Sequence, residues 1–136
     1  MAEINIRFKQ LTSEHGLSQS SVVALRQDKQ GFMWLGTQDG LNRYDGYQFK
    51  VFRHDQSDPN SISANWITAL HEDHRGMLWV GTLNGLNHFD KNNEQFVHYL
   101  HDPNNVNTLS HNIITSIVED KQGILWIGTR SGLNRF

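Results

Sequence analysis

Short runs of alternating apolar and polar residues recur three times along this chain. One run, at residues 31–42, reads Gly-Phe-Met-Trp-Leu-Gly-Thr-Gln-Asp-Gly-Leu-Asn, and close copies of it stand at residues 76–87 and 123–134. The copies start 45 and then 47 residues apart, which is a spacing typical of propellers and solenoids. We therefore interpret the chain as an array of repeats, each of which forms one supersecondary unit.

Each repeat contains the signals of short strands joined by tight turns. Residues 21–28, 66–73 and 113–120 are rich in β-branched residues and end at a turn, so they predict a first strand. The turn begins with Asp, which caps it through its carboxylate, and ends with Gly, which adopts the positive φ that it needs. The repeated block predicts a second strand, a hairpin at Asp-Gly or Asn-Gly, and a third strand. Residues 48–54 and 95–101 predict a fourth.

A four-stranded antiparallel meander is the unit of a β-propeller blade. The sequence therefore predicts an all-β fold of β-propeller blades, with three four-stranded antiparallel units in one chain of 136 residues. We place blade 1 at residues 21–54, blade 2 at residues 66–101, and blade 3, with its inner three strands, at residues 113–136. Residues 1–136 together are interpreted as a single propeller-repeat module.

The second strand of each unit is apolar on both faces. Trp34 and Leu35 point to opposite sides of the sheet because side chains alternate along a strand, and both are large and apolar. Such a sheet needs cover on both sides, which neighbouring blades provide. We therefore expect the recurring residues to form the scaffold. They are Trp34, Trp79 and Trp126, Gly36, Gly81 and Gly128, and Asp28, Asp73 and Asp120.

The two ends of the chain predict how a ring of blades closes. Residues 4–11 resemble an outer fourth strand, with Phe8 near the place of Phe52 and Tyr99, whereas the last unit stops at Phe136 after its third strand. Propellers have about 4 to 8 blades, so three are too few for a ring. We expect a homodimer or another homo-oligomer that closes the ring, for example six blades from two chains in which each N-terminal strand completes the other chain's last blade. The alternative is a segment of a longer propeller.

Composition and charge exclude several classes of function. With 12 Lys and Arg against 14 Asp and Glu, the net charge is −2, and no basic cluster offers a surface for nucleic acid. The lack of Cys removes disulfides and thiolate metal sites, and no apolar run is long enough for this chain to insert into a membrane. Because the sequence has no phosphate loop, nucleophile elbow or distinctive carboxylate pair, we expect neither an enzyme nor a cofactor.

The densest group of possible metal ligands is the run of His71, Glu72, Asp73 and His74. The other two copies have no histidine at these positions, and Asp73 is needed for its turn. The run also spans the end of a strand, where the two histidines need not converge on one ion. We therefore expect no metal site.

Residues that differ between the copies are the candidates for binding. The longest loops, at residues 55–65 and 102–112 with residues 12–20 as their first counterpart, end on the same face as the turns between the second and third strands. Trp66 stands on this face where the other copies have Ser and Ile. Aromatic, amide and charged side chains at a loop mouth suit a small polar ligand such as a sugar. The candidates are Asn65, Trp66, Asn112, Asp39, Asn84 and Arg130, with Gln38 beside Asp39.

The last copy, residues 114–136, reads Ile-Thr-Ser-Ile-Val-Glu-Asp-Lys-Gln-Gly-Ile-Leu-Trp-Ile-Gly-Thr-Arg-Ser-Gly-Leu-Asn-Arg-Phe. With the Asp-Pro-Asn linkers, it resembles the two-component regulator propeller repeat, and the resemblance runs from about Phe8 onward. It implies the periplasmic sensor region of a bacterial membrane receptor, ahead of a transmembrane helix and a cytoplasmic histidine kinase or diguanylate cyclase. Gut Bacteroides-type members imply oligosaccharide ligands. This sequence departs from the family in lacking the further blades, a membrane span and an output domain.

These observations favour a non-enzymatic, ligand-sensing propeller module of a bacterial signal-transduction receptor. It would bind a small polar ligand or a partner domain at its loop face. The alternative is a purely structural propeller segment that serves oligomerisation and has no ligand of its own. An enzyme of the propeller lyase or glycosidase kind ranks last, because no residue stands out from the repeat as catalytic.

Overall fold

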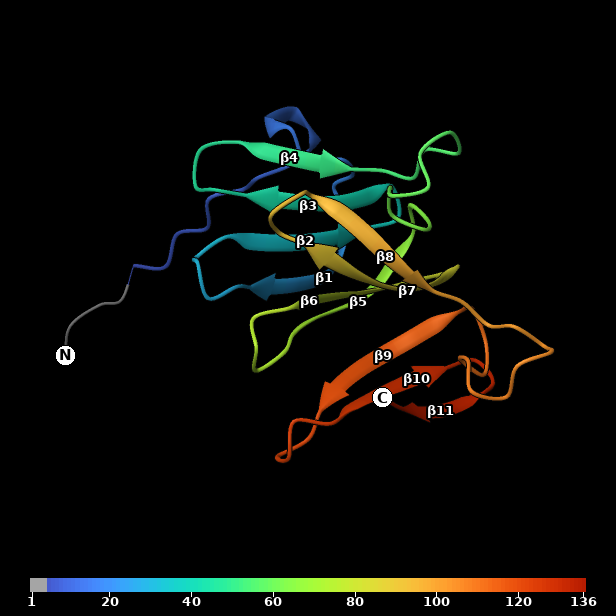
Figure 1. Cartoon of the computed structure of the whole chain (residues 1–136). Helices are drawn as coiled ribbons and strands as arrows, with labels where there is room; N and C mark the ends of the chain where they lie inside the picture. Colours follow the sequence, from blue (N-terminus) through green and yellow to red (C-terminus); the bar gives the residue numbers. More distant parts are fainter. Residues whose placement is uncertain (1–4) are drawn as a thin grey trace.

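A computed structural model describes residues 5–136 as three antiparallel β-sheets set in a row (Figure 1). The only helix among these residues is the 3-10 turn η1, Ser13–His15. The first sheet has the strands β1 Val22–Gln27, β2 Met33–Thr37, β3 Gly40–Tyr44 and β4 Phe49–Phe52. The second sheet has β5 Ile67–Glu72, β6 Leu78–Thr82, β7 Gly85–Asp90 and β8 Gln95–Tyr99. The third has β9 Ile114–Glu119, β10 Leu125–Thr129 and β11 Gly132–Arg135.

Every strand pairs with its sequence neighbour. The order is β1-β2-β3-β4 in the first sheet, β5-β6-β7-β8 in the second and β11-β10-β9 in the third. All of these pairings are antiparallel. The all-β prediction of antiparallel blade units is therefore confirmed, with three strands rather than four in the last sheet.

The turn between the first and second strands forms as its Asp and Gly predict. The Asp28 carboxylate accepts hydrogen bonds from the amides of Gln30 (2.9 Å) and Phe32 (3.0 Å). Gly31 has a φ of 94° and donates its amide to the Asp28 carbonyl. The same bonds recur around Asp73 and Asp120. Each turn is closed by its own side chain, as expected for Asp at the first position.

The second oxygen of each turn Asp holds a tryptophan, which the sequence analysis did not anticipate. The Trp34 indole donates to Asp28 Oδ2 at 2.8 Å, and the Trp79 indole donates to Asp73 Oδ2 at 2.9 Å. Trp126 and Asp120 repeat the bond at 2.9 Å. A buried indole N–H usually has an acceptor, because leaving it without one costs free energy. One Asp therefore both closes the turn and permits the burial of the Trp.

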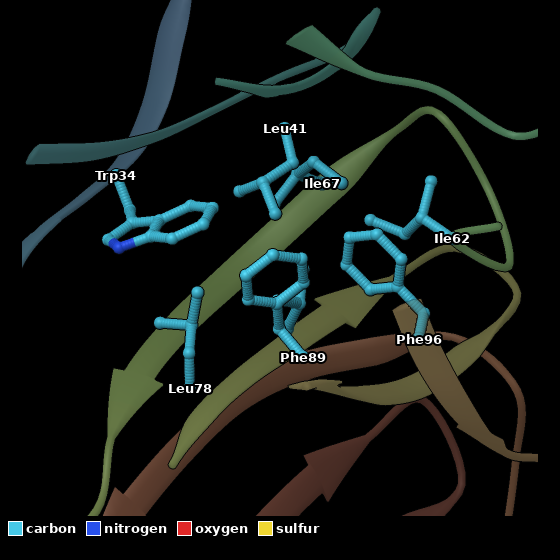
Figure 2. Packing of buried hydrophobic residues seen from close by; sticks show 8 residues of the cluster. Trp34, Leu41, Ile62, Ile67, Leu78, Phe89 and Phe96 are labelled. Atoms are coloured by element: carbon cyan, nitrogen blue, oxygen red, sulfur yellow. The ribbon is translucent and has the colours of Figure 1, made fainter. Parts of the chain in front are cut away.

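The hydrophobic core lies between the sheets. Between the first and second sheets, Trp34 and Leu41 meet residues of the second sheet, and the rings of Trp34 and Phe89 lie 5.1 Å apart (Figure 2). The other buried members of this cluster are Ile62, Ile67, Leu78, Val80 and Phe96. Between the second and third sheets, the buried cluster is Trp79, Leu86, Ile114, Leu125 and Ile127. The predicted stacking of apolar blades on one another is thereby confirmed.

The glycine in the middle of each second strand allows the sheets to approach closely. A Cβ added to Gly36 would lie 2.5 Å from Ile67 Cγ2, and one added to Gly81 would lie 2.6 Å from Ile114 Cγ2. Both isoleucines start the first strand of the next sheet, and β1, β5 and β9 pack side by side. A larger residue at these glycines would force the inner strands apart.

The outer strand expected at residues 4–11 does not form within the single chain. Ile4 lies outside the described residues, and residues 5–11 belong to no strand. A strand needs an edge to pair with, and the open edge at β11 lies in the last sheet, at the other end of the row (Figure 1). Pairing of this segment with a second chain stays a prediction.

Two of the four tryptophans make a matched test of this packing. Trp79 is 1% exposed and Trp66 is 44% exposed. We expect Trp79→Ala to lower the free energy of unfolding by about 3 to 5 kcal/mol, as truncation of a buried aromatic does, and Trp66→Ala to lower it by less than about 1 kcal/mol. Urea unfolding followed by circular dichroism measures both. Equal losses in the two variants would contradict face-to-face packing of the sheets.

Candidate functional site

One edge of the row of sheets gathers all the residues predicted to bind a ligand. The Gly40 amide donates to the Asn65 carbonyl at 2.7 Å, and the Gly85 amide donates to the Asn112 carbonyl at 2.6 Å. These bonds join the turn between the second and third strands of one sheet to the loop that enters the next. We call this edge the loop face. It consists of residues 38–39, 65–66, 83–84, 112–113 and 130–131.

Within the second and third sheets the loop face is held together by a further backbone bond. The Leu83 amide donates to the Trp66 carbonyl at 3.2 Å, and the Arg130 amide donates to the Ile113 carbonyl at 3.1 Å. The sequence argument that these loops and turns share one face therefore matches the geometry. Whether the face binds a ligand is a separate question, taken up below.

Polar triads anchor the long loops to their sheets. Ser18 donates its amide to Asn42 Oδ1 at 2.9 Å, and its hydroxyl lies 2.9 Å from Thr37 Oγ1. The Asn42 amide returns a bond to Ser18 Oγ at 2.8 Å. The second and third sheets repeat these bonds with Ser63, Thr82 and Asn87, and with Ser110, Thr129 and Asn134. Such satisfied networks hold the loop backbone in one position.

The sequence reasoning missed these triads, although the signal was available. The same Ser, Thr and Asn recur in every copy, with 19 residues from Ser to Thr and 24 from Ser to Asn. A constant separation across three copies indicates a shared contact, because the connecting loops otherwise vary.

Two predicted binding residues have a role inside the loops. The side-chain oxygen of Asn65 accepts the His54 amide at 2.7 Å, and that of Asn112 accepts the His101 amide at 2.7 Å. Each bond closes a loop of eleven residues at its ends. Each of these oxygens therefore already accepts one bond within the protein.

The other predicted residues differ in how open they are. Asp39 forms an ion pair with Arg53 at 3.2 Å. Trp66, Asn84 and Arg130 are exposed, and Gln38 beside Asp39 is also exposed. The open side chains of the loop face are thus one indole, two amides and one guanidinium. Together they provide an aromatic surface and several hydrogen-bond donors.

The histidines considered as metal ligands face the neighbouring sheet instead. His71 Nε2 lies 3.3 Å from Glu119 Oε1, and His74 Nδ1 hydrogen-bonds to Glu119 Oε2. The side-chain bond from His74 holds the pKa of Glu119 below its ordinary value, against the opposing effect of desolvation. Between the first and second sheets, the Lys29 amide donates to Glu72 at 3.0 Å in the same place. This run of residues therefore joins sheets together.

Comparison with known proteins agrees with this architecture. Stacked four-stranded antiparallel sheets with inward first strands are propeller blades. The family described as two component regulator propeller matches residues 16–39, 61–84 and 108–131. The three matches span more than half of the chain, and the chain belongs to this family.

Relatives place these blades in signalling proteins. The chain is 52% identical to histidine kinase P4 of Formosa agariphila over 59 residues. This stretch covers 43% of this chain and 4% of that protein. The extracellular domain of a hybrid two component system from B. thetaiotaomicron superposes with a TM-score of 0.87 at 31% identity, over 94% of this chain and 18% of that one. A second such domain from the same organism has a TM-score of 0.53 at 22% identity, over 89% of this chain and 22% of that one, and shows the fold alone.

The chain thus spans under a fifth of the length of the first two relatives. Its own contribution is that of a sensor-type propeller domain of two-component systems, and the solved neighbours are extracellular domains. Among residues 5–136, no helix is long and apolar enough to cross a membrane.

The charge of Asp73 gives a prediction about pH. Burial raises the pKa of Asp73, but hydrogen bonds from the Trp79 indole and the Met77 and Arg75 amides outweigh it and hold the pKa below its ordinary value. A carboxyl group whose pKa is lower in the folded than in the unfolded state stabilises the fold at pH values above its unfolded pKa. This stabilisation is lost as the pH falls through the pKa of the folded state. We therefore expect the free energy of unfolding to decrease once the pH drops below about 4.

The variant Asp73→Asn isolates this effect. Asp73 accepts hydrogen bonds on both carboxylate oxygens, whereas Asn would present an N–H group in place of one of them. One buried donor then has no acceptor, which should lower the free energy of unfolding by about 1 to 3 kcal/mol at neutral pH. The dependence of stability on pH between about 3 and 6 should be shallower in the variant than in the wild type. Urea titrations across this range measure the slope, and parallel curves would contradict the role of the Asp73 charge.

Proposed function

We propose that this chain is part of the periplasmic, ligand-sensing propeller of a bacterial two-component receptor, and that the loop face binds a small polar ligand of the oligosaccharide class. Membership of the family and the signalling relatives support the receptor assignment. The extracellular neighbours support a position outside the cytoplasmic membrane. The chain acts by binding and leaves catalysis to other parts of such a receptor.

One observation carries the choice of the loop face. The recurring Trp, Asp, Ser, Thr and Asn side chains spend their polar atoms on bonds within the scaffold, whereas Trp66, Asn84 and Arg130 lie exposed on rigid loops where the copies differ. A sugar has an apolar face that stacks on an indole, and hydroxyls that accept from amides and guanidinium groups. The loop face presents these groups together.

The position of the loops explains how binding can be transmitted. Asn65 belongs to the loop entering the second sheet and bonds to Gly40 of the first, and Asn112 bonds in the same way across the next boundary. A ligand that touches loops of two sheets therefore also contacts the boundary between them. When the two sheets can adopt two arrangements at this boundary, such a ligand shifts the equilibrium between them. The size of the shift is set by the difference between its affinities for the two arrangements.

A thermal-shift screen tests this proposal. With a panel of neutral and acidic oligosaccharides, we expect at least one to raise the melting temperature, because a ligand that binds only the folded state stabilises it. Trp66→Ala and Arg130→Ala should each raise the dissociation constant for that sugar by about tenfold. The rise in melting temperature at a given sugar concentration should then be smaller.

Tyr47→Ala is the matched control. Tyr47 is an exposed aromatic residue in the turn between β3 and β4, at the opposite edge of the first sheet, and its removal should leave the response unchanged. A panel in which no sugar stabilises the protein would overturn the sugar assignment. A response that survives Trp66→Ala and Arg130→Ala would overturn the location.

A further inference from the structure

Three positions of the repeat combine Arg or Lys in the first copy with His in the second. The pairs are Arg26 and His71, Lys29 and His74, and Arg43 and His88. Lys and Arg keep their charge between about pH 5 and 8, whereas His, with an ordinary pKa of about 6.5, changes its charge within this range. The second sheet therefore carries groups that respond to pH at places where the first sheet carries constant charges.

Two of these histidines contact one carboxylate of the third sheet. His71 Nε2 lies 3.3 Å from Oε1 of Glu119, the last residue of β9, and His74 Nδ1 hydrogen-bonds to Oε2 of the same residue. The His74 amide also donates to Oε2 at 3.1 Å. Both oxygens of Glu119 are thus occupied by groups of the second sheet, and the contact lies on the boundary between the second and third sheets.

The contact is partly shielded from solvent. The side chains of His71 and Glu119 are 13% and 14% exposed, and that of His74 is 59% exposed. The bond from His74 holds the pKa of Glu119 below its ordinary value, so this carboxylate keeps its charge throughout the range in which histidines titrate. A charged imidazole forms an ion pair with the carboxylate that a neutral imidazole cannot form. The contact therefore strengthens as the histidines become charged.

The other acidic groups near the histidines are engaged elsewhere. Glu72 accepts the Lys29 amide of the first sheet at 3.0 Å. Asp73 and Asp120 each accept the indole of their own sheet at 2.9 Å. Among residues 5–136, Glu119 is thus the carboxylate that both imidazoles contact.

The basic groups near the histidines keep a constant charge. The Lys29 ammonium donates to the His74 carbonyl at 2.8 Å, and the Arg75 guanidinium lies 3.8 Å from the Asp73 carboxylate. Lys121 belongs to the turn that follows β9. These three cations are exposed, so solvent screens their repulsion of a charged imidazole more than it screens the direct bond to the carboxylate.

His88 responds to pH in the opposite direction. Its ring lies 5.4 Å from that of Trp79, and its Nδ1 lies 3.0 Å from the Tyr99 hydroxyl. Burial lowers the pKa of His88, against the attraction of Asp90 and Asp73. Charging of His88 therefore costs stability, and a test of the contact between the sheets must leave this residue unchanged.

The boundary between the first and second sheets has a corresponding contact with constant charges. Glu72 occupies the position of Glu119. It accepts the Lys29 amide, as Glu119 accepts that of His74. The cation that binds the Glu72 carboxylate is the Lys91 ammonium, at 3.1 Å. Lysine and glutamate both keep their charge between about pH 5 and 8.

We propose that the boundary between the second and third sheets is a pH-sensitive contact, which His71 and His74 strengthen around Glu119 as the pH falls from about 8 to about 5.5. The boundary between the first and second sheets keeps its polar contact unchanged over this range. A change of pH therefore alters the stability of one boundary relative to the other. This inference rests on contacts inside the chain and is independent of the ligand proposed above.

The test is a double-mutant cycle at two pH values. Urea unfolding of the wild type, His74→Gln, Glu119→Gln and the double variant gives the coupling between the two side chains as a factor in the unfolding equilibrium constant. We expect a factor of about five at about pH 5.5 and of less than about two at about pH 8. Gln keeps an oxygen for the His74 amide, so the variants should fold. The same cycle with His71→Gln should change with pH in the same direction.

The matched control is the cycle of Lys91→Gln and Glu72→Gln, whose coupling should be the same at both pH values. A coupling between His74 and Glu119 that is absent, equal at the two pH values or larger at the higher one would overturn the proposal. A control coupling that falls with rising pH by the same factor would also overturn it, because the effect would then belong to the whole fold.

Discussion

The hydrogen bond between a buried tryptophan and a turn aspartate is the interaction on which this structure depends. One carboxylate oxygen of Asp73 closes the turn between β5 and β6, and the other accepts the indole N–H of Trp79. The indole then lies across the boundary in the core of the next sheet. Removal of the acceptor would leave a buried N–H without a partner, which costs more than the bond itself contributes. Local turn geometry and packing between sheets are coupled through this one residue.

The repetition of this interaction gives the array its direction. Every sheet has a side with Trp and Gly, and its other side has Val22 in the first sheet and Ile67 or Ile114 in the next two. Each boundary joins unlike sides. Such arrays are held together by contacts between nearest neighbours, so an end sheet is always incompletely covered. The scaffold is therefore uniform along its length, while differences between the copies are concentrated on the loop face. Trp66 and Arg130 can vary there because no neighbouring sheet packs on them.

Most of the scaffold could be predicted from the sequence, because its signals are local and occur three times. The strands, the Asp turns and the placement of Trp34 and Trp79 between sheets follow from alternation and from turn chemistry. The indole bonds and the triad of Ser18, Thr37 and Asn42 were not predicted. The indole bonds join residues only six apart, but the Asp was already explained by its turn and the Trp by its place in the core. The triad joins residues 19 and 24 apart whose types are ordinary in turns and loops.

The binding face and the chain ends were harder to predict for different reasons. Asn65 and Asn112 read as polar loop residues, but their side-chain oxygens close the loops on which they lie. Sequence alone does not separate an amide that stabilises a loop from one that meets a ligand. Residues 5–11 have the pattern of a strand, yet they pair with no strand in the single chain. Whether such a segment forms a strand depends on its partner.

The exchange rates of the four indole N–H protons test the central claim most directly. Nuclear magnetic resonance resolves these protons, and hydrogen exchange measures how often each loses its acceptor and meets water. The account predicts slow exchange for Trp34 and Trp79, faster exchange for Trp126 in the end sheet when the chain is monomeric, and the fastest for exposed Trp66. Equal rates for Trp79 and Trp66 would contradict the claim that buried Trp–Asp bonds hold the sheets together.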